Sequence, residues 1–249
     1  SVVYLEEKEE ILCSFKDITE LKKYEVFRKD LILNVSHELK TPLTAIKGFI
    51  ETIEESDINP EVRNYIEVIQ RHTDRLIRII QDLLVLSSLE QKKDPELTQK
   101  IELISVVKNI EKIFEKKIKE KGLDFEVSIP DDIPSFIGDE FSIEQMFINL
   151  IDNAVKYTDK GKIQIIIRAE KNNIQIQISD TGVGIPAKDL ERIFERFYVV
   201  DKSRSRELGG TGLGLSIVKH IVNLHSGSIK VESVSGKGTA FNIFIPVNR

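Results

Sequence analysis

Residues 139–157, DEFSIEQMFINLIDNAVKY, carry apolar side chains at every third or fourth position, which predicts an amphipathic helix. The apolar residues share one side of that helix, whereas Asn149, Asn153 and Lys156 share the other. Tyr157 lies at the edge of this polar stripe. Two amides on an otherwise buried helix are costly unless something binds them. A carboxamide oxygen suits a hard cation such as Mg²⁺ and a lysine suits a phosphate, so the stripe indicates either a nucleotide site or a structural hydrogen-bond network.

Shorter segments, some with the period of a helix and some with that of a strand, surround this helix from residue 94 onward. Further helices are expected over residues 103–121, ended by Gly122, and over residues 212–224. Strands are expected over residues 124–129, 162–169, 174–179, 228–233 and 239–246. The predicted architecture is therefore an α/β sandwich, in which helices lie on one side of a mixed sheet.

The chain before residue 94 has a longer periodic pattern. Apolar residues recur every three or four positions over residues 21–55 and 60–91, and Asn59-Pro60 between them is a turn signal. These features predict an antiparallel helical hairpin, and neither helix can bury its apolar stripe against a single neighbour. A dimeric four-helix bundle solves that problem. The predicted domains are a tail over residues 1–20 with a strand at 11–15, the hairpin over 21–93, and the sandwich over 94–249, with a hinge near 92–98.

His37 lies on the first predicted helix, almost opposite its apolar side, and is therefore expected to face solvent. Imidazole near neutral pH is an adequate nucleophile, and Glu38 beside it can orient the ring or accept a proton. Thr41 falls on the same side of the helix, and Pro42 is expected to bend the helix just after the histidine. Periodicity alone leaves open that His37 is only a solvated residue.

Two glycine runs follow the amide helix. The first, Asp180-Thr-Gly-Val-Gly-Ile185, comes directly after a predicted strand, and the Asp180 carboxylate can accept a hydrogen bond from an amine such as that of adenine. Taken alone, this run could equally be a strand-to-loop turn. The second, GGTGLGL at residues 209–215, opens a helix whose first N–H groups favour phosphate. No strand leads into it and no P-loop lysine follows, which argues against Rossmann and Walker sites.

Between the two glycine runs, the segment FERFY at residues 194–198 precedes a polar stretch that contains Lys202, Arg204 and Arg206. An aromatic anchor before a mobile basic loop is what a lid over ATP needs, with the arginines reaching phosphoryl charge. A solvated surface loop is the alternative.

The composition argues against several other classes of protein. The 36 basic and 41 acidic residues of the 249-residue chain leave a net charge of -5, which gives no electrostatic case for nucleic acid. The single cysteine, Cys13, cannot form an internal disulfide and has no Cys and His cluster of metal-ligand spacing around it. No apolar run approaches the ~20 residues that cross a bilayer, so a membrane anchor is expected only in segments outside this chain.

His72 is expected in a layer of the bundle, and His220 and His225 in structural roles at a helix end.

The run VSHELKTPLT at residues 35–44 resembles the H box of sensor histidine kinases of two-component systems. The amide helix, the first glycine run, FERFY and the second glycine run resemble, in that order, the N, G1, F and G2 boxes of the same family. The resemblance spans residues 22–249, and within it the sequence is similar to phosphate-regulon-type sensor kinases. It implies a dimerisation and phosphoacceptor (HisKA) domain, then a HATPase_c domain with the Bergerat (GHKL) fold of Hsp90, DNA gyrase and MutL. Residues 17–21, DITEL, look like the exit of a PAS sensor module.

The resemblance also implies the chemistry. ATP and Mg²⁺ would serve autophosphorylation of His37 with Glu38 as base, followed by transfer to an aspartate of a response regulator. Glu38 and Thr41 would serve the reverse task, dephosphorylation of that regulator. Asn153, helped by Asn149, would ligate Mg²⁺. The other residues implied at the nucleotide site are Lys156 and Tyr157 at phosphate, Asp180 at the adenine amine, and Gly182, Gly184, Ile185, Phe197, Arg204, Gly210, Thr211, Gly212, Leu213 and Gly214.

Finally, the resemblance implies a homodimer and the cytoplasmic portion of a membrane-anchored bacterial sensor. It leaves open whether His37 meets the ATP of its own subunit or that of its partner. Asn149 stands where related ATPases carry a catalytic glutamate, which favours transfer to histidine over hydrolysis. Val199 and Ser226 depart from the arginine and glycine that many relatives have at these positions. The alternatives are a GHKL-type ATPase clamp and a non-catalytic dimerisation scaffold.

Overall fold

The computed structural model describes residues 2–5, 10–13, 36, 39–40, 43–44, 46–51, 53, 59–91, 99–201 and 209–247. Most of residues 99–247 form the predicted α/β sandwich, and residues 60–91 form the second helix of the predicted hairpin. None of the helices described in these ranges is both long and apolar enough to span a bilayer.

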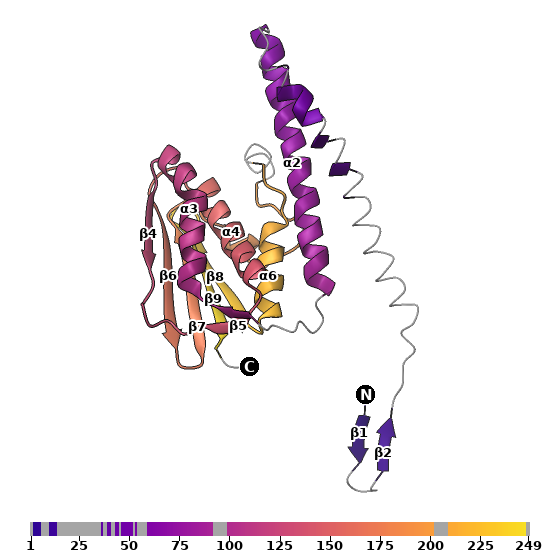
Figure 1. The fold of residues 1–249 in the computed structure, drawn as a ribbon, viewed down its shortest axis with the longest axis vertical. Helices are drawn as coiled ribbons and strands as arrows, with labels where there is room; N and C mark the ends of the chain where they lie inside the picture. The colour runs from indigo at the N-terminus through magenta and orange to yellow at the C-terminus, as the bar shows by residue number, and fades with distance from the viewer. Residues whose placement is uncertain are drawn as a thin grey trace.

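The sandwich is built on a five-stranded mixed sheet (Figure 1). Its central strands are rich in isoleucine at alternate positions, so one face is apolar: Ile163, Ile165 and Ile167 are all buried. The first strand runs parallel to its neighbour, and the remaining neighbours pair antiparallel. In spatial order the strands are β4 (Asp124–Ser128), β6 (Lys162–Glu170), β7 (Asn173–Asp180), β9 (Gly238–Pro246) and β8 (Ser228–Val234).

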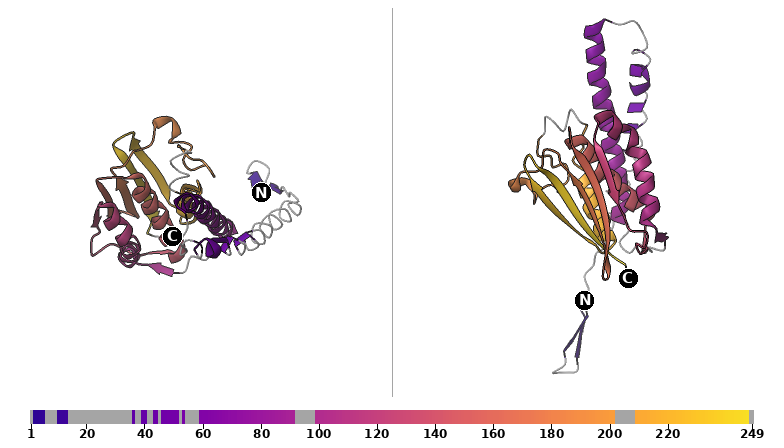
Figure 2. Two further views of the ribbon diagram at one scale, coloured as in Figure 1. Left: turned by 90° about the horizontal axis from the view of Figure 1, so that it is seen from above. Right: turned by 90° about the vertical axis from the view of Figure 1, so that its left-hand side faces the viewer.

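Three helices cover the apolar face of this sheet: α3 (Leu103–Lys121), α4 (Glu140–Tyr157) and α6 (Gly214–Leu224). Figure 2 shows the sheet on one side and the helices on the other when the sandwich is seen edge-on. Local signals set the helix ends, because Gly122 closes α3 in the left-handed conformation and the Asp139 carboxylate accepts the Ser142 N–H at 3.3 Å. The prediction for these three helices is confirmed to within two residues.

Helix α2 (Pro60–Gln91) lies beside α6, and the described residues between 36 and 53 are also helical (Figure 1). Lys47 of that first segment pairs with Asp74 of α2 at 2.8 Å. Ile50 and Ile66 are buried, yet a row of large apolar side chains stays exposed on both segments. These residues are Leu39, Ile46, Phe49 and Ile53 on the first segment and Val62, Tyr65, Ile69 and Leu76 on α2.

The structure adds several short elements, most of which were not predicted. Strand β3 (Gln99–Ile101) pairs with β5 (Phe136–Gly138), and β1 (Val2–Leu5) pairs with β2 (Glu10–Cys13), which overlaps the strand expected at residues 11–15. A 3₁₀ turn, η1 (Ala187–Asp189), follows the first glycine run. Three or four residues are too few to reveal an apolar period in a sequence.

His225 has the structural role that was predicted for it at the end of α6. The side chain is buried, and its Nδ1 lies 2.8 Å from the carbonyl of Ile221. Its Nε2 accepts the backbone N–H of Asp139, the residue that caps α4, at 3.1 Å. His225 thus ties the end of α6 to the start of α4.

Candidate nucleotide-binding site

The centre of the candidate site is the carboxyl-terminal half of α4. Asn149, Asn153, Lys156 and Tyr157 are half-buried there, as the helical stripe predicted, while the opposite side of the helix is buried in the core. The Asn149 amide donates to the carbonyl of Gln145 at 2.8 Å. Among the residues that the structure describes, the Asn153 amide has no hydrogen-bond partner. Asn153 therefore presents an uncommitted amide at the expected position of a ligand.

The first glycine run closes against the end of α4. Asp180 ends β7, and its carboxylate accepts the N–H of Gly182 at 2.8 Å. A side chain at Gly182 would collide with the carbonyl of Tyr157, and the Val183 N–H donates to that same carbonyl at 3.1 Å. Only glycine allows the loop this close to the helix.

Burial raises the pKa of the Asp180 carboxyl above its ordinary value. The backbone N–H groups of Gly182 and Thr239 act in the other direction by favouring the charged form, without cancelling the effect of burial. A carboxylate in such surroundings gains from any further hydrogen-bond donor, which is the property an adenine-reading residue needs.

The rest of the first run is fixed by the β8–β9 hairpin. Gly184 has a φ of +67°, and a side chain there would meet the carbonyl of Val234. The N–H of Ile185 donates to the Ser233 hydroxyl at 2.7 Å, and Ile185 packs against the core. The run is thus a rigid loop and not a simple turn.

The second glycine run starts α6 against the middle of α4. A side chain at Gly214 would overlap the Asn149 amide oxygen, and Leu213 before it is buried. Gly212 has a φ of +75°, and its carbonyl accepts the N–H of Phe197 at 2.9 Å. This contact links the second run to the FERFY segment. The two glycine runs and the amide helix therefore meet in the fold. Their order in the sequence alone could not establish this contact.

A small ionic cluster on α4 includes one of the predicted phosphate ligands. The ammonium of Lys156 lies 2.5 Å from the Asp152 carboxylate, which also pairs with Lys117 of α3 at 3.3 Å. Burial opposes ionisation of Asp152, but the two lysines outweigh it, so its pKa lies below the ordinary value. Sequence reasoning had placed Lys156 on the polar stripe but had not found these partners.

Helix α2 contacts the second glycine run directly. Arg75 donates to the carbonyl of Gly210 at 3.0 Å, and the Thr211 hydroxyl donates to the Asp82 carboxylate at 2.6 Å. Burial raises the pKa of Asp82, although the Thr211 hydroxyl and the charge of Lys156 favour its ionised form. Sequence reasoning missed these contacts, because no local pattern connects Asp82 with a residue 129 positions away.

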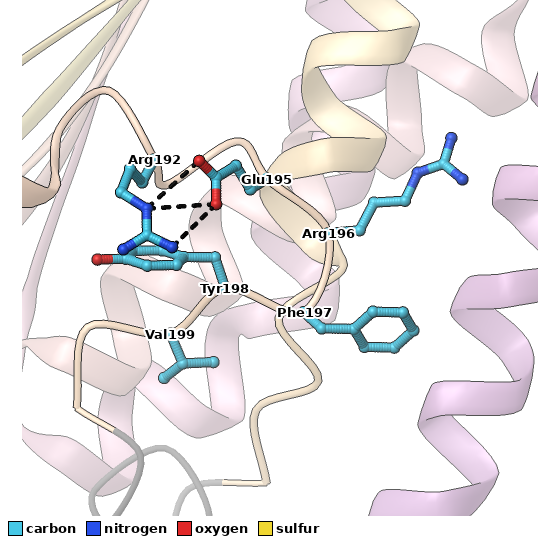
Figure 3. A pocket seen from close by; sticks show the side chains of 6 residues that line it. All are labelled: Arg192, Glu195, Arg196, Phe197, Tyr198 and Val199. Atoms are coloured by element: carbon cyan, nitrogen blue, oxygen red, sulfur yellow. Dashed lines mark hydrogen bonds and ion pairs between the residues drawn. The ribbon is translucent and has the colours of Figure 1, made fainter.

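The FERFY segment lines an open hollow of about 380 Å³ beside the site (Figure 3). Arg192 pairs with Glu195 at 3.2 Å and stacks over the Tyr198 ring, whose hydroxyl donates to the buried Asp189 at 2.6 Å. Phe194, not Phe197, packs against the core. Phe197 has a φ of +61° and its side chain is 57% exposed. The lining residues of the hollow are Arg192, Glu195, Arg196, Phe197, Tyr198 and Val199.

The structure gathers most of the predicted nucleotide-site residues around α4 but describes none of the three predicted catalytic residues. His37, Glu38, Thr41 and Arg204 lie outside the described residues, as does the expected hinge at residues 92–98. Ser226, the noted departure from glycine, has a φ of +53°, a conformation that glycine adopts without strain.

The residues present fit a magnesium–nucleotide complex. Within the described ranges, no group of three or more His, Cys, Asp or Glu side chains could hold a metal ion. Mg²⁺ commonly takes one or two protein oxygens and completes its shell with phosphates and water. The uncommitted Asn153 amide matches that requirement, and it lies one helical turn after Asn149, against which the phosphate-favouring start of α6 packs.

Comparison with protein families identifies two regions of the chain. Residues 27–92 match HisKA, the "His Kinase A (phospho-acceptor) domain". Residues 138–249 match HATPase_c, the "Histidine kinase-, DNA gyrase B-, and HSP90-like ATPase". The order of the two regions agrees with the order of boxes in the sequence.

Curated relatives match over nearly the whole chain. The sensor histidine kinase WalK of Bacillus subtilis is 38% identical over 92% of this chain, which covers 38% of that protein. The phosphate regulon sensor protein PhoR of Pseudomonas aeruginosa is 37% identical over 93% of this chain, which covers 53% of it. The chain thus spans between about a third and about half of the length of these relatives.

Solved structures agree in fold. Full-length ShkA in complex with AMPPNP superposes with a TM-score of 0.70 at 25% identity, covering 87% of this chain and 45% of ShkA. The histidine kinase ThkA in complex with the response regulator protein TrrA superposes with a TM-score of 0.60 at 27% identity, covering 99% of this chain and 73% of that one.

Proposed function

Because the chain belongs to the sensor histidine kinases of two-component systems, we propose that it binds ATP with Mg²⁺, phosphorylates its own His37 and passes the phosphoryl group to a response regulator. The observation that carries this proposal is the meeting of both glycine runs with α4, Gly182 against Tyr157 and Gly214 against Asn149. That meeting brings together the amide, lysine and backbone N–H groups that a nucleotide needs. The role of His37 rests on its H box and on the HisKA match.

In this proposal the nucleotide lies along the polar side of α4. Asp180 accepts the adenine amine, while Lys156 and Tyr157 contact phosphate. The first N–H groups of α6, from Gly214 onward, face the phosphates with the positive end of the helix dipole. The complex of ShkA with AMPPNP supports an ATP-type ligand for this fold.

Asn153, assisted by Asn149, would hold the Mg²⁺ ion. When bound, the cation would neutralise negative charge on the phosphate oxygens. The residues of this chain orient the phosphates, and the segment from Phe194 through Arg204 closes over them to exclude water. The close approach of the α6 start at Gly214 to Asn149, one turn before Asn153 on α4, supports this assignment.

The chemical step is an in-line attack by a ring nitrogen of His37 on the γ-phosphorus. A nitrogen–phosphorus bond forms, the bond to the ADP oxygen breaks, and Glu38 accepts the proton that leaves the ring. Asn149 cannot take a proton from water, since it is an amide whose N–H₂ already donates to Gln145. Transfer to histidine is therefore favoured over hydrolysis, which weighs against a clamp-type ATPase.

The acceptor of the phosphoryl group would be an aspartate of a response regulator, and ThkA in complex with TrrA supports a partner of this kind. Glu38 and Thr41 would also position water to dephosphorylate that aspartate. In this case Thr41→Ala lowers phosphatase activity and spares autophosphorylation. An equal loss of both activities would contradict the assignment of Thr41.

The active form would be a homodimer. The exposed row on α2, Val62, Tyr65, Ile69 and Leu76, is spaced as the seam of a helical bundle. A second copy of the hairpin would cover this row and complete a four-helix bundle. Exposed apolar rows of this kind mark interaction surfaces, and this supports the proposed partner copy. His72 lies within the row and would occupy a layer of the bundle.

The domain limits of this proposal are residues 21–93 for the phosphoacceptor domain and 94–249 for the ATP-binding domain. The matched ranges, 27–92 and 138–249, fall within them. Residues 1–20 would be the end of a PAS-type sensor module, to which the β1–β2 pair would belong.

Incubation of the chain with γ-labelled ATP tests the proposal. Label should appear on the protein as an acid-labile, base-stable phosphoramidate and should be absent from His37→Gln. His72→Gln is the matched control, since it changes the other histidine of the hairpin, which is exposed, and should keep the label. ATP hydrolysis without protein label would point to the clamp ATPase, and nucleotide binding without either would point to the scaffold.

A further inference from the structure

The carboxyl-terminal turn of α4 is held from outside the helix. The last four carbonyls of an α-helix have no partner within the helix. In α4, the Val155 carbonyl accepts from the ammonium of Lys121 at 2.7 Å. The same ammonium lies 3.3 Å from the carbonyl of Thr158 and 3.4 Å from that of Lys156. An ammonium has three protons, so one side chain of α3 can satisfy three carbonyls at this helix end.

Lys121 is directed toward α4 by the end of its own helix. It is the last residue of α3, and Gly122 after it has a φ of +63°. The N–H groups of Gly122 and Leu123 bond back to the carbonyls of Lys119 and Ile118 at 3.0 and 3.1 Å. This closed end fixes the point from which the Lys121 side chain leaves α3.

The turn that Lys121 holds is also the turn that closes the nucleotide site. Its carbonyl at Tyr157 accepts the N–H of Val183, the centre of the first glycine run. Asn153 and Lys156 belong to the same turn. A shift of this helix end would therefore move the amide, the lysine and the glycine loop relative to one another.

Lys121 also changes the electrostatics of the helix end. The carboxyl end of a helix carries the equivalent of about −0.5 charge, which repels a triphosphate. Lys156 cannot fully offset this, because its ammonium is paired with Asp152 at 2.5 Å. The ammonium of Lys121 places positive charge directly on the carbonyls and removes much of that repulsion.

We propose that Lys121 is a positioning residue for nucleotide binding, which fixes the carboxyl-terminal turn of α4 and offsets its negative end. This inference rests on the proposed function, because it takes the polar side of α4 as the ATP site. Lys121 acts through the helix backbone and does not itself touch the ligand.

The test compares Lys121→Met with the unchanged chain, using direct binding of Mg–ATP and autophosphorylation at saturating ATP. The affinity for ATP should fall about tenfold, because a charge-assisted hydrogen bond at the helix end is lost. The rate at saturating ATP should stay within about twofold, because the chemistry at His37 is untouched. Adenosine, which lacks phosphates, should lose less affinity than ATP, and Lys121→Arg should recover most of the loss.

Lys119→Met is the matched control, since it removes the same charge from the same helix end, where Lys119 pairs only with Glu115 of its own helix at 2.6 Å in the described contacts. It should leave ATP affinity unchanged. A melting temperature lowered by Lys121→Met with unchanged ATP affinity would overturn the proposal, as would equal losses for ATP and adenosine. If Lys121→Met does not fold, Lys121→Gln carries the same comparison. Failure of the unchanged chain to bind ATP would instead reject the proposed function.

Discussion

The sandwich and the hairpin solve the problem of burying apolar surface in opposite ways. In the sandwich, Ile151 of α4 is fully buried between the sheet and its neighbouring helices. In the hairpin, Ile69 of α2 is 49% exposed within a row of similar side chains. The contact between the two regions combines hydrogen bonds of Arg75 and Asp82 with apolar packing, because Leu86 and Leu89 near the end of α2 are buried in the same cluster as the sandwich core. The sandwich thus closes its core together with the end of α2, whereas the exposed row farther along the hairpin is left for the second copy proposed above.

The largest effect that would test this comparison comes from a pair of equal truncations. Ile151→Ala should lower the free energy of unfolding of the sandwich by about 3 kcal/mol, because it leaves a cavity in a closed core. Ile69→Ala should change the sandwich transition by less than about 0.5 kcal/mol. Urea denaturation followed by circular dichroism measures both. Equal losses would mean that the exposed row of α2 also belongs to the sandwich core.

The next effect concerns the exposed row itself. Ile69→Glu should weaken dimerisation about a hundredfold, because it places a charge in the seam between two hairpins. Sedimentation velocity over a range of protein concentrations measures the change. Ile113→Glu on α3 is the control, since Ile113 is 55% exposed but lies outside the hairpin. If both variants stay dimeric, the row on α2 is not the dimer interface.

A smaller effect is expected at the polar contact between the two regions. The pKa of Asp82 is raised because burial penalises the ionised carboxylate more than the Thr211 hydroxyl favours it. For an acid with a raised pKa, the contribution to stability is present at low pH and is lost as the pH rises through the raised pKa. The contact should therefore tighten by a few fold as the pH falls through the raised pKa of Asp82. Protection factors from hydrogen exchange at residues 209–213, which correct for the pH dependence of the intrinsic exchange rate, measure the tightening.

Asp82→Asn separates this carboxylate from the other groups that titrate in the same range. The amide keeps an acceptor for the Thr211 hydroxyl without the cost of a buried charge. At neutral pH this variant should show the higher protection factors that the unchanged chain reaches only below the raised pKa of Asp82. A variant that exchanges faster at every pH would reverse the assigned sign.

The smallest effect is a gain in stability at one turn of the sandwich. Lys171 joins β6 to β7 with a φ of +47°, a conformation that glycine adopts without strain. Lys171→Gly should raise the free energy of unfolding by about 0.5 kcal/mol, measured by thermal denaturation. Asn172→Gly, at the next position, should give no gain, because its φ is not positive. This pair shows whether the sandwich can be stabilised without altering the hairpin.

The sequence predicted those features that a local pattern encodes. Helix α3 and its end at Gly122 were predicted because a long apolar period and a capping glycine agree. Strands β3 and β5 were missed because each has three residues, and their pairing joins segments that are far apart in the chain. Within the site, the amide stripe and the glycine runs were predicted from their residue types. The side chains and backbone groups that hold the stripe and the runs in place could not be predicted, because they come from other elements.

Lys156 illustrates that limit. Its position on the polar stripe of α4 follows from the helical period, and Asp152, four positions earlier, is a possible ion-pair partner on any helix. That Lys117 joins this pair depends on how α3 packs on α4. The contact of Lys121 with the same helix end depends on that packing too. Neither contact has a signature in one sequence.

The order of strands in the sheet has a consequence for synthesis on the ribosome. Strand β9 is made last but lies inside the sheet, between β7 and β8. At about 5–20 residues per second, roughly 8–30 seconds separate the end of α2 from the end of β9. During that interval the hairpin, whose contacts are local, can fold and meet the hairpin of a neighbouring nascent chain. Pairing of subunits would then precede closure of the nucleotide site, and a chain cut short before β9 could occupy a dimer without ever binding ATP.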